Sequence, residues 1–233
     1  MISGKETDDV SGAARPARGD SPPDSPGDIP EEAQGELAEP EELAGEEPGP
    51  QPPPPPQVAE LAAACVRFVA TRYSTALDFA PDTLSFVDHW LREAREDLAG
   101  RPEAAELVQA AAGAYLGEVI RLAFGGHWVA EGDHADWRLQ LERVYCAFNP
   151  IGMAREALLL ETADGWHAHF ELDPGEAEAI ERRLAALPPA PDEEYYAPST
   201  RFDVVSILFE ALRTGMRARG LSDVRFTHED YSS

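Results

Sequence analysis

The sequence predicts an α+β protein: a single domain of about five helices packed on a small, mainly antiparallel sheet, preceded by a disordered, acidic, proline-rich tail. Three observations lead to this prediction. The composition changes abruptly near residue 58. Beyond that point, several long segments have apolar residues at helical spacing. Shorter segments with alternating polar and apolar residues lie between them, without a regular strand–helix alternation.

The first 57 residues lack the side chains that a hydrophobic core requires. They contain no Phe, Trp or Tyr, 13 of the 21 prolines, and 14 acidic against 3 basic side chains. Ordering a chain costs roughly 1–2 kcal/mol per residue, and this segment has too little apolar surface to offset that cost. We therefore predict a disordered tail and linker over 1–57, with residues 48–57 acting as a polyproline II spacer. Within it, Leu37 and Leu43 are candidate contacts for a partner, although a fully solvated tail is the alternative.

Residues 58–233 carry all 19 aromatic residues and are predicted to form the globular domain. Helices are expected over 58–72, 82–98, 102–124, 153–160, 173–187 and 200–216. The pattern is strongest over 102–124, where a proline begins the helix and a wide apolar face follows. Gly113 and Gly117 lie on a second, small-residue strip of this helix. Because glycine in a helix interior costs roughly 1 kcal/mol relative to alanine, we expect another backbone to approach closely here.

The remaining segments favour strands and turns. Alternation over 137–142 predicts a half-buried strand, and 165–172 alternates in the same way. Further strands are expected over 75–79, 127–131, 144–148 and 224–228, with a turn at 149–152.

Charge limits the classes of partner. The net charge is −25, made up of −11 from residues 1–57 (3 − 14) and −14 from the rest (16 − 30). Binding to nucleic acid or to an anionic membrane depends on cationic side chains, so neither is expected, and a basic protein is the favoured partner. The first residues lack the apolar run of a signal peptide. The longest uncharged helical stretch, 107–117, is too short to span a bilayer. A cytoplasmic location is therefore expected.

Motifs for catalysis are not apparent, and we predict neither catalytic residues nor a cofactor. There is no GxSxG motif and no phosphate-binding glycine loop. Cys65 and Cys146 do not form a CxxC pair, and Cys65 is expected to be a buried free thiol. Glu118 lies within the apolar face of helix 102–124. It could act as a general acid or base with a raised pKa, but an ion pair with an arginine is the favoured interpretation.

Histidines provide the alternative hypothesis. His167 and His169 are two residues apart and would share one face of a strand. His127 and His134 could complete a site for zinc if their hairpin lay alongside. This group would suit a metal-dependent hydrolase, but exposed, unliganded histidines are the favoured interpretation because no recognised metal-binding spacing is present.

One segment resembles an uncharacterised family of bacterial α+β domains. The residues that carry the resemblance are Gly113-Ala-Tyr-Leu-Gly-Glu-Val-Ile-Arg121, then Gly125-Gly-His-Trp128, then the turn Asn149-Pro-Ile-Gly152. The resemblance covers about residues 75–165. It implies a bacterial source and an α+β fold, but no reaction or ligand.

Together these observations favour a non-enzymatic cytoplasmic binding or regulatory module that engages a basic protein. Acidity and a flexible tether suit electrostatically steered association. Trp128 and Trp137 are the candidate partner contacts in the folded domain, beside the two leucines of the tail.

Overall fold

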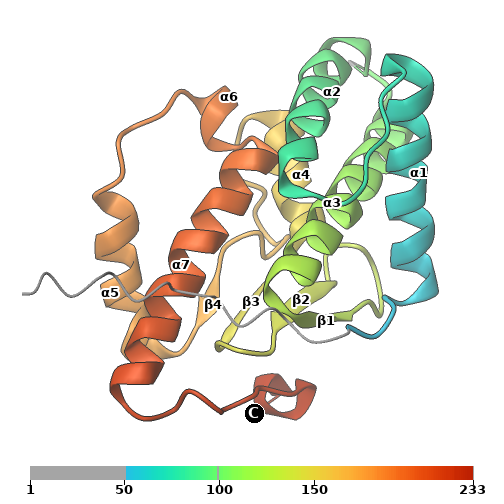
Figure 1. The fold of residues 1–233 in the computed structure, drawn as a ribbon. Helices are drawn as coiled ribbons and strands as arrows, with labels where there is room; N and C mark the ends of the chain where they lie inside the picture. Colours follow the sequence, from blue (N-terminus) through green and yellow to red (C-terminus); the bar gives the residue numbers. More distant parts are fainter. Residues whose placement is uncertain (1–50, 99, 233) are drawn as a thin grey trace, which may run out of the picture. The chain divides into compact units, whose positions relative to one another are not determined.

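Seven α-helices and a four-stranded antiparallel sheet form the part of the chain that the computed structural model describes, residues 51–98 and 100–232 (Figure 1). This confirms the α+β class. The helices are α1 (Pro56–Tyr73), α2 (Leu84–Asp97), α3 (Pro102–Phe124), α4 (Pro150–Leu159), α5 (Pro174–Ala185), α6 (Asp192–Tyr195) and α7 (Pro198–Ala218). The strands are β1 (Gly126–Val129), β2 (Arg138–Leu141), β3 (Cys146–Phe148) and β4 (Glu171–Leu172).

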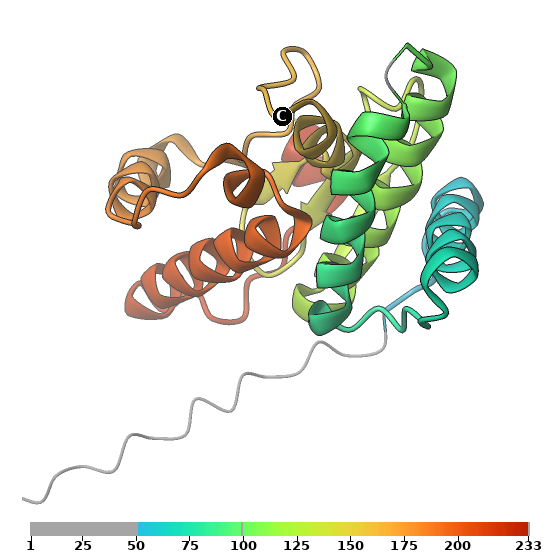
Figure 2. The same cartoon turned by 90° about the horizontal axis from the view of Figure 1, so that it is seen from above.

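Helix α3 is the central element of the fold. It contacts α1, α2, α4 and α7 as well as β1 and β2, and Figure 2 shows α1 on one side of it and α5 and α7 on the other. Residues 109–121 are all buried. By length and composition, α3 is the one described helix that could cross a membrane, but 72% of its apolar window is buried within the fold. A core helix has the same composition.

The two glycines of α3 are sites of close approach, as predicted. A Cβ atom at Gly113 would collide with the Ile151 backbone at the start of α4, and at Gly117 it would collide with the Trp128 ring. One approach is therefore made by a backbone and the other by a side chain. The absence of a Cβ lets α4 and β1 lie directly against the helix.

Helices α4 and α7, like α1, begin earlier than predicted. Asn149 caps α4, because its Oδ1 accepts hydrogen bonds from the amides of Ile151 (2.9 Å) and Gly152 (3.2 Å). The expected turn at 149–152 is therefore wrong, and these residues form the helix start. Helix α7 begins at Pro198, not at a Thr200 cap. In both helices the proline occupies the first turn, where a missing N–H costs no hydrogen bond.

The sheet has the order β1-β2-β3-β4, and each strand pairs with the next in antiparallel fashion. Its predicted extent is wrong in three places. Residues 75–79 form no strand, because Phe79 has a positive φ of 65° and donates its amide to the Tyr115 hydroxyl. Only Glu171–Leu172 of the expected strand 165–172 is present, since His167 has a φ of 50°. Residues 224–228 instead cross the end of β2, where the Phe226 amide donates to the Glu142 carbonyl.

Residues 51–57 do not form the free spacer that the sequence suggested. Helix α1 already begins at Pro56, and Arg121 Nη1 donates to the Pro52 carbonyl at 2.9 Å. The folded domain thus extends before residue 58. The predicted disorder of residues 1–50 lies outside the described residues.

Candidate functional site

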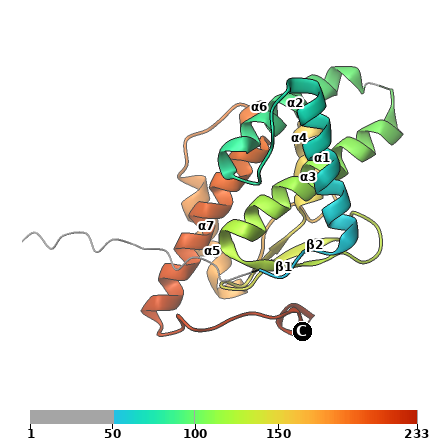
Figure 3. The ribbon, with the colours of Figure 1, turned by 45° about the vertical axis from the view of Figure 1, so that its right-hand side comes forward.

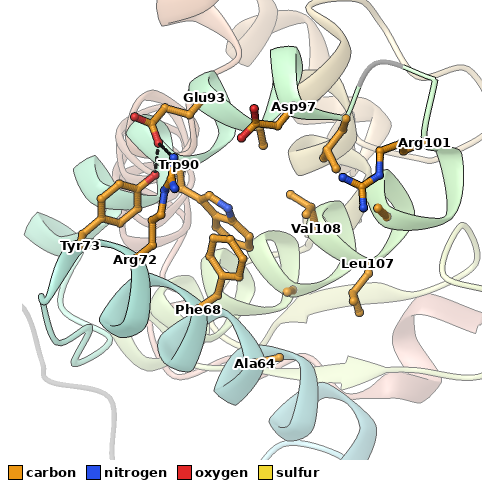
Figure 4. A pocket seen from close by; sticks show the side chains of 14 residues that line it. Ala64, Phe68, Arg72, Tyr73, Trp90, Glu93, Asp97, Arg101, Leu107 and Val108 are labelled. Carbon is orange, nitrogen blue, oxygen red and sulfur yellow. Dashed lines mark hydrogen bonds and ion pairs between the residues drawn. The ribbon is translucent and has the colours of Figure 1, made fainter.

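A groove of about 360 Å³ lies between α1, α2 and α3 (Figure 4). Each of the three helices contributes side chains to it. Small apolar residues form much of the lining: Ala64, Ala94, Ala104, Val108 and Ala111. Concave sites with a largely apolar lining and a few polar groups are typical of ligand and partner binding.

An aromatic pair dominates one side of the groove. The Phe68 ring of α1 stacks on Trp90 of α2, with ring centroids 4.6 Å apart and an interplanar angle of 27°. Trp90 is 3% exposed, whereas Phe68 is 45% exposed. On the other rim, Leu107 of α3 is 61% exposed. Large apolar side chains are thus presented to solvent around an apolar floor, an arrangement that marks interaction surfaces.

Polar groups define the Tyr73 end of the groove. The Tyr73 hydroxyl donates to Glu93 Oε2 at 2.8 Å, and Arg72 Nη2 lies 3.4 Å from the same oxygen. His89 Nε2 is 3.5 Å from Glu93 Oε1. The hydrogen bond from Tyr73, followed by that from Arg72, lowers the pKa of the Glu93 carboxyl. Glu93 is therefore ionised and held in place on the groove wall.

Two further charged side chains of the groove, those of Asp97 and Arg101, are not engaged elsewhere in the described chain. Asp97 closes α2 and Arg101 immediately precedes α3, and both line the groove. Neither forms an ion pair within residues 51–98 and 100–232. Figure 4 shows Arg101 at the end of the groove away from Tyr73, and Asp97 on the wall between Glu93 and Arg101. They are available to polar groups of a bound partner.

The sequence did not identify this groove. Helical spacing groups Phe68 with the apolar residues of the predicted helix 58–72, and it gives no role to Trp90 or Leu107. Trp90 follows the buried Val87 by three residues, so helical spacing already placed it on the buried face of α2. The helix packing that brings α1 beside α2 carries no comparable signal in the sequence.

The two tryptophans proposed as partner contacts belong to the interior instead. Trp128 is 7% exposed and Trp137 is 5% exposed. Trp128 packs against Gly117 and donates its Nε1 proton to Glu118 Oε1 at 2.7 Å. Burial of both rings leaves little surface for a partner, so this assignment is corrected. Leu37 and Leu43 lie outside the described residues.

The four histidines of the metal hypothesis are not brought together. His127 Nε2 lies 2.7 Å from Gln140 Oε1 on the sheet, and His134 packs edge-on against Trp137. His169 is exposed, 4.0 Å from Glu156 Oε1, and His167 lines a separate shallow depression with it. Among residues 51–98 and 100–232, no group of three or more His, Cys, Asp or Glu side chains is arranged to hold a metal.

Glu118 forms the predicted ion pair. Both of its oxygens accept from Arg121, at 2.9 Å from Nε and 2.8 Å from Nη2. The Trp128 indole supplies a third donor, and both charged side chains are about 5% exposed. Both oxygens of the Glu118 carboxylate thus accept hydrogen bonds from neighbouring side chains, as expected for a structural ion pair.

We expect Glu118→Gln to lower the free energy of unfolding by about 2 kcal/mol, because a charged hydrogen-bond acceptor of a buried arginine is lost. Glu103→Gln, on the exposed first turn of the same helix, is the matched control and should change little. Urea denaturation measures both. Equal stability of the two variants would contradict the structural role of Glu118.

The two cysteines are buried free thiols, as expected for Cys65. Burial raises the pKa of both thiols. Because the thiolate is the reactive species, neither cysteine is suited to nucleophilic chemistry.

Comparison with protein-family models, with curated proteins and with solved structures finds no match to this chain. The resemblance of about residues 75–165 to a bacterial α+β family therefore stays a prediction.

Proposed function

We propose that this protein is a non-enzymatic binding module that engages a basic protein through the groove between α1, α2 and α3. The observation that carries this proposal is the stacked Phe68–Trp90 pair, with Phe68 exposed on the rim of an apolar groove. Exposing such a ring to water is unfavourable unless a partner covers it. No arrangement of residues in the described chain supports a competing catalytic role.

The shape of the groove suits an amphipathic helix from the partner. A groove between packed helices accepts the apolar face of such a helix, whose anchors recur at positions i, i+3, i+4 and i+7. Aromatic side chains that line a pocket are the usual energetic centre of such interfaces. Phe68 and Leu107 would then contact the partner's anchors from opposite rims.

Charge favours a basic partner. The net charge of −25 attracts cations over the range of a Debye length and raises the association rate. Within the groove, Asp97 can receive a lysine or arginine that flanks the apolar anchors. Glu93 already accepts a hydrogen bond from Tyr73 and is paired with Arg72, so Asp97 is the acidic contact that we expect a partner to use.

We expect Phe68→Ala and Leu107→Ala each to weaken binding to the partner. Truncating an interface hot spot costs about 2 kcal/mol, which corresponds to roughly 30-fold in the dissociation constant. Leu122→Ala is the matched control, because Leu122 is a 42%-exposed leucine on α3 that does not line the groove. The partner is recovered by affinity capture with the full chain and quantified by mass spectrometry, and its affinity is then measured with each variant.

Salt provides the second test. Recovery of the partner should fall at high ionic strength, because exposed charges are screened beyond about 10 Å at 0.1 M salt. The proposal is wrong if every captured protein is recovered equally by wild type, Phe68→Ala and Leu122→Ala.

A further inference from the structure

The outer edge of β1 is covered by the proline-rich segment that leads into α1 and includes its first two residues. We call residues 51–57 the strap; they consist of Gln51, five prolines and Gln57. Among residues 51–98 and 100–232, β1 is an edge strand of the sheet and pairs with β2 alone. Figure 3 shows the strap beside β1 on its way into α1.

Two glutamine side chains bind the ends of that edge. The Gly126 amide donates to Gln51 Oε1 at 3.4 Å, and Gln57 Nε2 donates to the Ala130 carbonyl at 2.9 Å. Between them, Arg121 Nη1 donates to the Pro52 carbonyl. The strap is thus attached by side chains, whereas its prolines have no N–H to offer to the strand.

The direction of the backbone groups follows from the pairing with β2. The Gly125 carbonyl accepts from the Glu142 amide, so Gly125 faces β2. In an antiparallel ladder alternate residues face alternate sides. Residues 126, 128 and 130 therefore direct their amides and carbonyls away from β2, toward the strap.

This outward-facing set is self-complementary about Trp128. A second copy of β1, placed antiparallel and related by a twofold axis at Trp128, would align Gly126 with Ala130 of the copy and Ala130 with Gly126 of the copy. The Gly126 amide, which now donates to Gln51 Oε1, would instead donate to the Ala130 carbonyl of the copy. The Ala130 carbonyl, which now accepts from Gln57 Nε2, would instead accept from the Gly126 amide of the copy. A twofold interface of this kind closes on itself as a dimer.

We propose that the edge of β1 is a self-pairing surface for a second copy of this chain, and that the strap masks it. The two glutamines occupy the terminal hydrogen-bonding groups of the edge, and the prolines between them have no N–H with which to form a strand pair. Edge strands without such protection pair readily with other strands. Release of the strap therefore exposes a dimerisation surface that is distinct from the groove.

The test compares three full-length proteins by light scattering over a range of concentrations. The release variant carries Gln51→Ala and Gln57→Ala, with glycine in place of each proline at 52–55; the third protein adds Ala130→Pro to it. We expect wild type at its monomer mass of 25.3 kDa and a twofold higher mass for the release variant. Ala130→Pro should restore the monomer, because proline removes one outward-facing amide from the edge.

Circular dichroism checks that each variant keeps its helices. Should the release variant unfold, Gln57→Ala alone is used, since its side chain is exposed; it should show a smaller, concentration-dependent rise in mass. A folded variant that stays monomeric at all concentrations overturns the proposal. If wild type and the release variant dimerise equally, the strap does not mask the edge. If the release variant still dimerises after Ala130→Pro is added, the dimer does not form through β1.

Discussion

Gly113→Ala is expected to destabilise the protein by about 3 kcal/mol, because overpacking a core forces the neighbouring structure to move. A Cβ atom at this position would collide with Ile151 Cα and lie 2.7 Å from the Pro150 carbonyl oxygen. These are backbone atoms at the capped start of α4, and they cannot rotate away as a side chain would. The free energy of unfolding, obtained from denaturant titration, measures the effect.

Gly215→Ala is the matched control for this substitution. Gly215 also lies inside a helix, near the end of α7, but a Cβ there would meet its nearest neighbour, Glu176 Oε2, at an ordinary 3.8 Å. Alanine is favoured over glycine in helices by about 1 kcal/mol, so this variant should be slightly more stable than wild type. A Gly113→Ala protein as stable as Gly215→Ala would show that α3 and α4 are not in close contact.

Arg201→Met is expected to lower the free energy of unfolding by about 3–5 kcal/mol, the cost of leaving a buried charge without its partner. Arg201 Nη2 donates to Glu156 Oε2 at 2.7 Å, and the exposed fractions are 6% for Arg201 and 0% for Glu156. The guanidinium also lies over the Tyr195 ring, 4.6 Å from its centroid. This pair joins α7 to α4, so its loss should weaken the packing of both helices.

An exposed ion pair provides the control for Arg201. Arg182 and Glu178 on α5 are 73% and 87% exposed, and exposed pairs contribute little to stability. Arg182→Met should therefore leave the unfolding curve nearly unchanged. In the double variant Glu156→Leu/Arg201→Met both charges of this pair are removed, and much of the lost stability should return. A double variant as unstable as Arg201→Met would contradict the explanation.

Helices were predictable where both their periodicity and their ends are local. The bounds of α3 follow from Pro102 and from Gly125 after the last apolar residue, and the structure has the same bounds. The start of α4 was missed because Asn149-Pro150 is equally compatible with a turn and with a helix cap. Only the packing of Ile151 against Gly113 selects the helix.

Strand extents were less predictable because they depend on pairing with distant residues. Residues 165–172 do alternate between polar and apolar side chains, but only Glu171 and Leu172 pair with a neighbouring strand, β3.

The candidate site also depends on contacts between residues that are distant in the sequence. Trp128 and Trp137 were predicted as partner contacts, but Trp128 lies in β1, Trp137 immediately precedes β2, and both rings are buried. The groove depends on how α1 packs beside α2 and α3, which no local pattern encodes.

Photocrosslinking from the groove tests the proposed function most directly. A photoreactive amino acid is placed in the full chain at position 107 and, as the control, at position 122 on the same helix. The proposal predicts that one basic protein is crosslinked from position 107, is absent from the position 122 sample, and is lost when Phe68→Ala is added. The same proteins crosslinked from both positions, or a position 107 crosslink that is unaffected by Phe68→Ala, would contradict the groove as the site of binding.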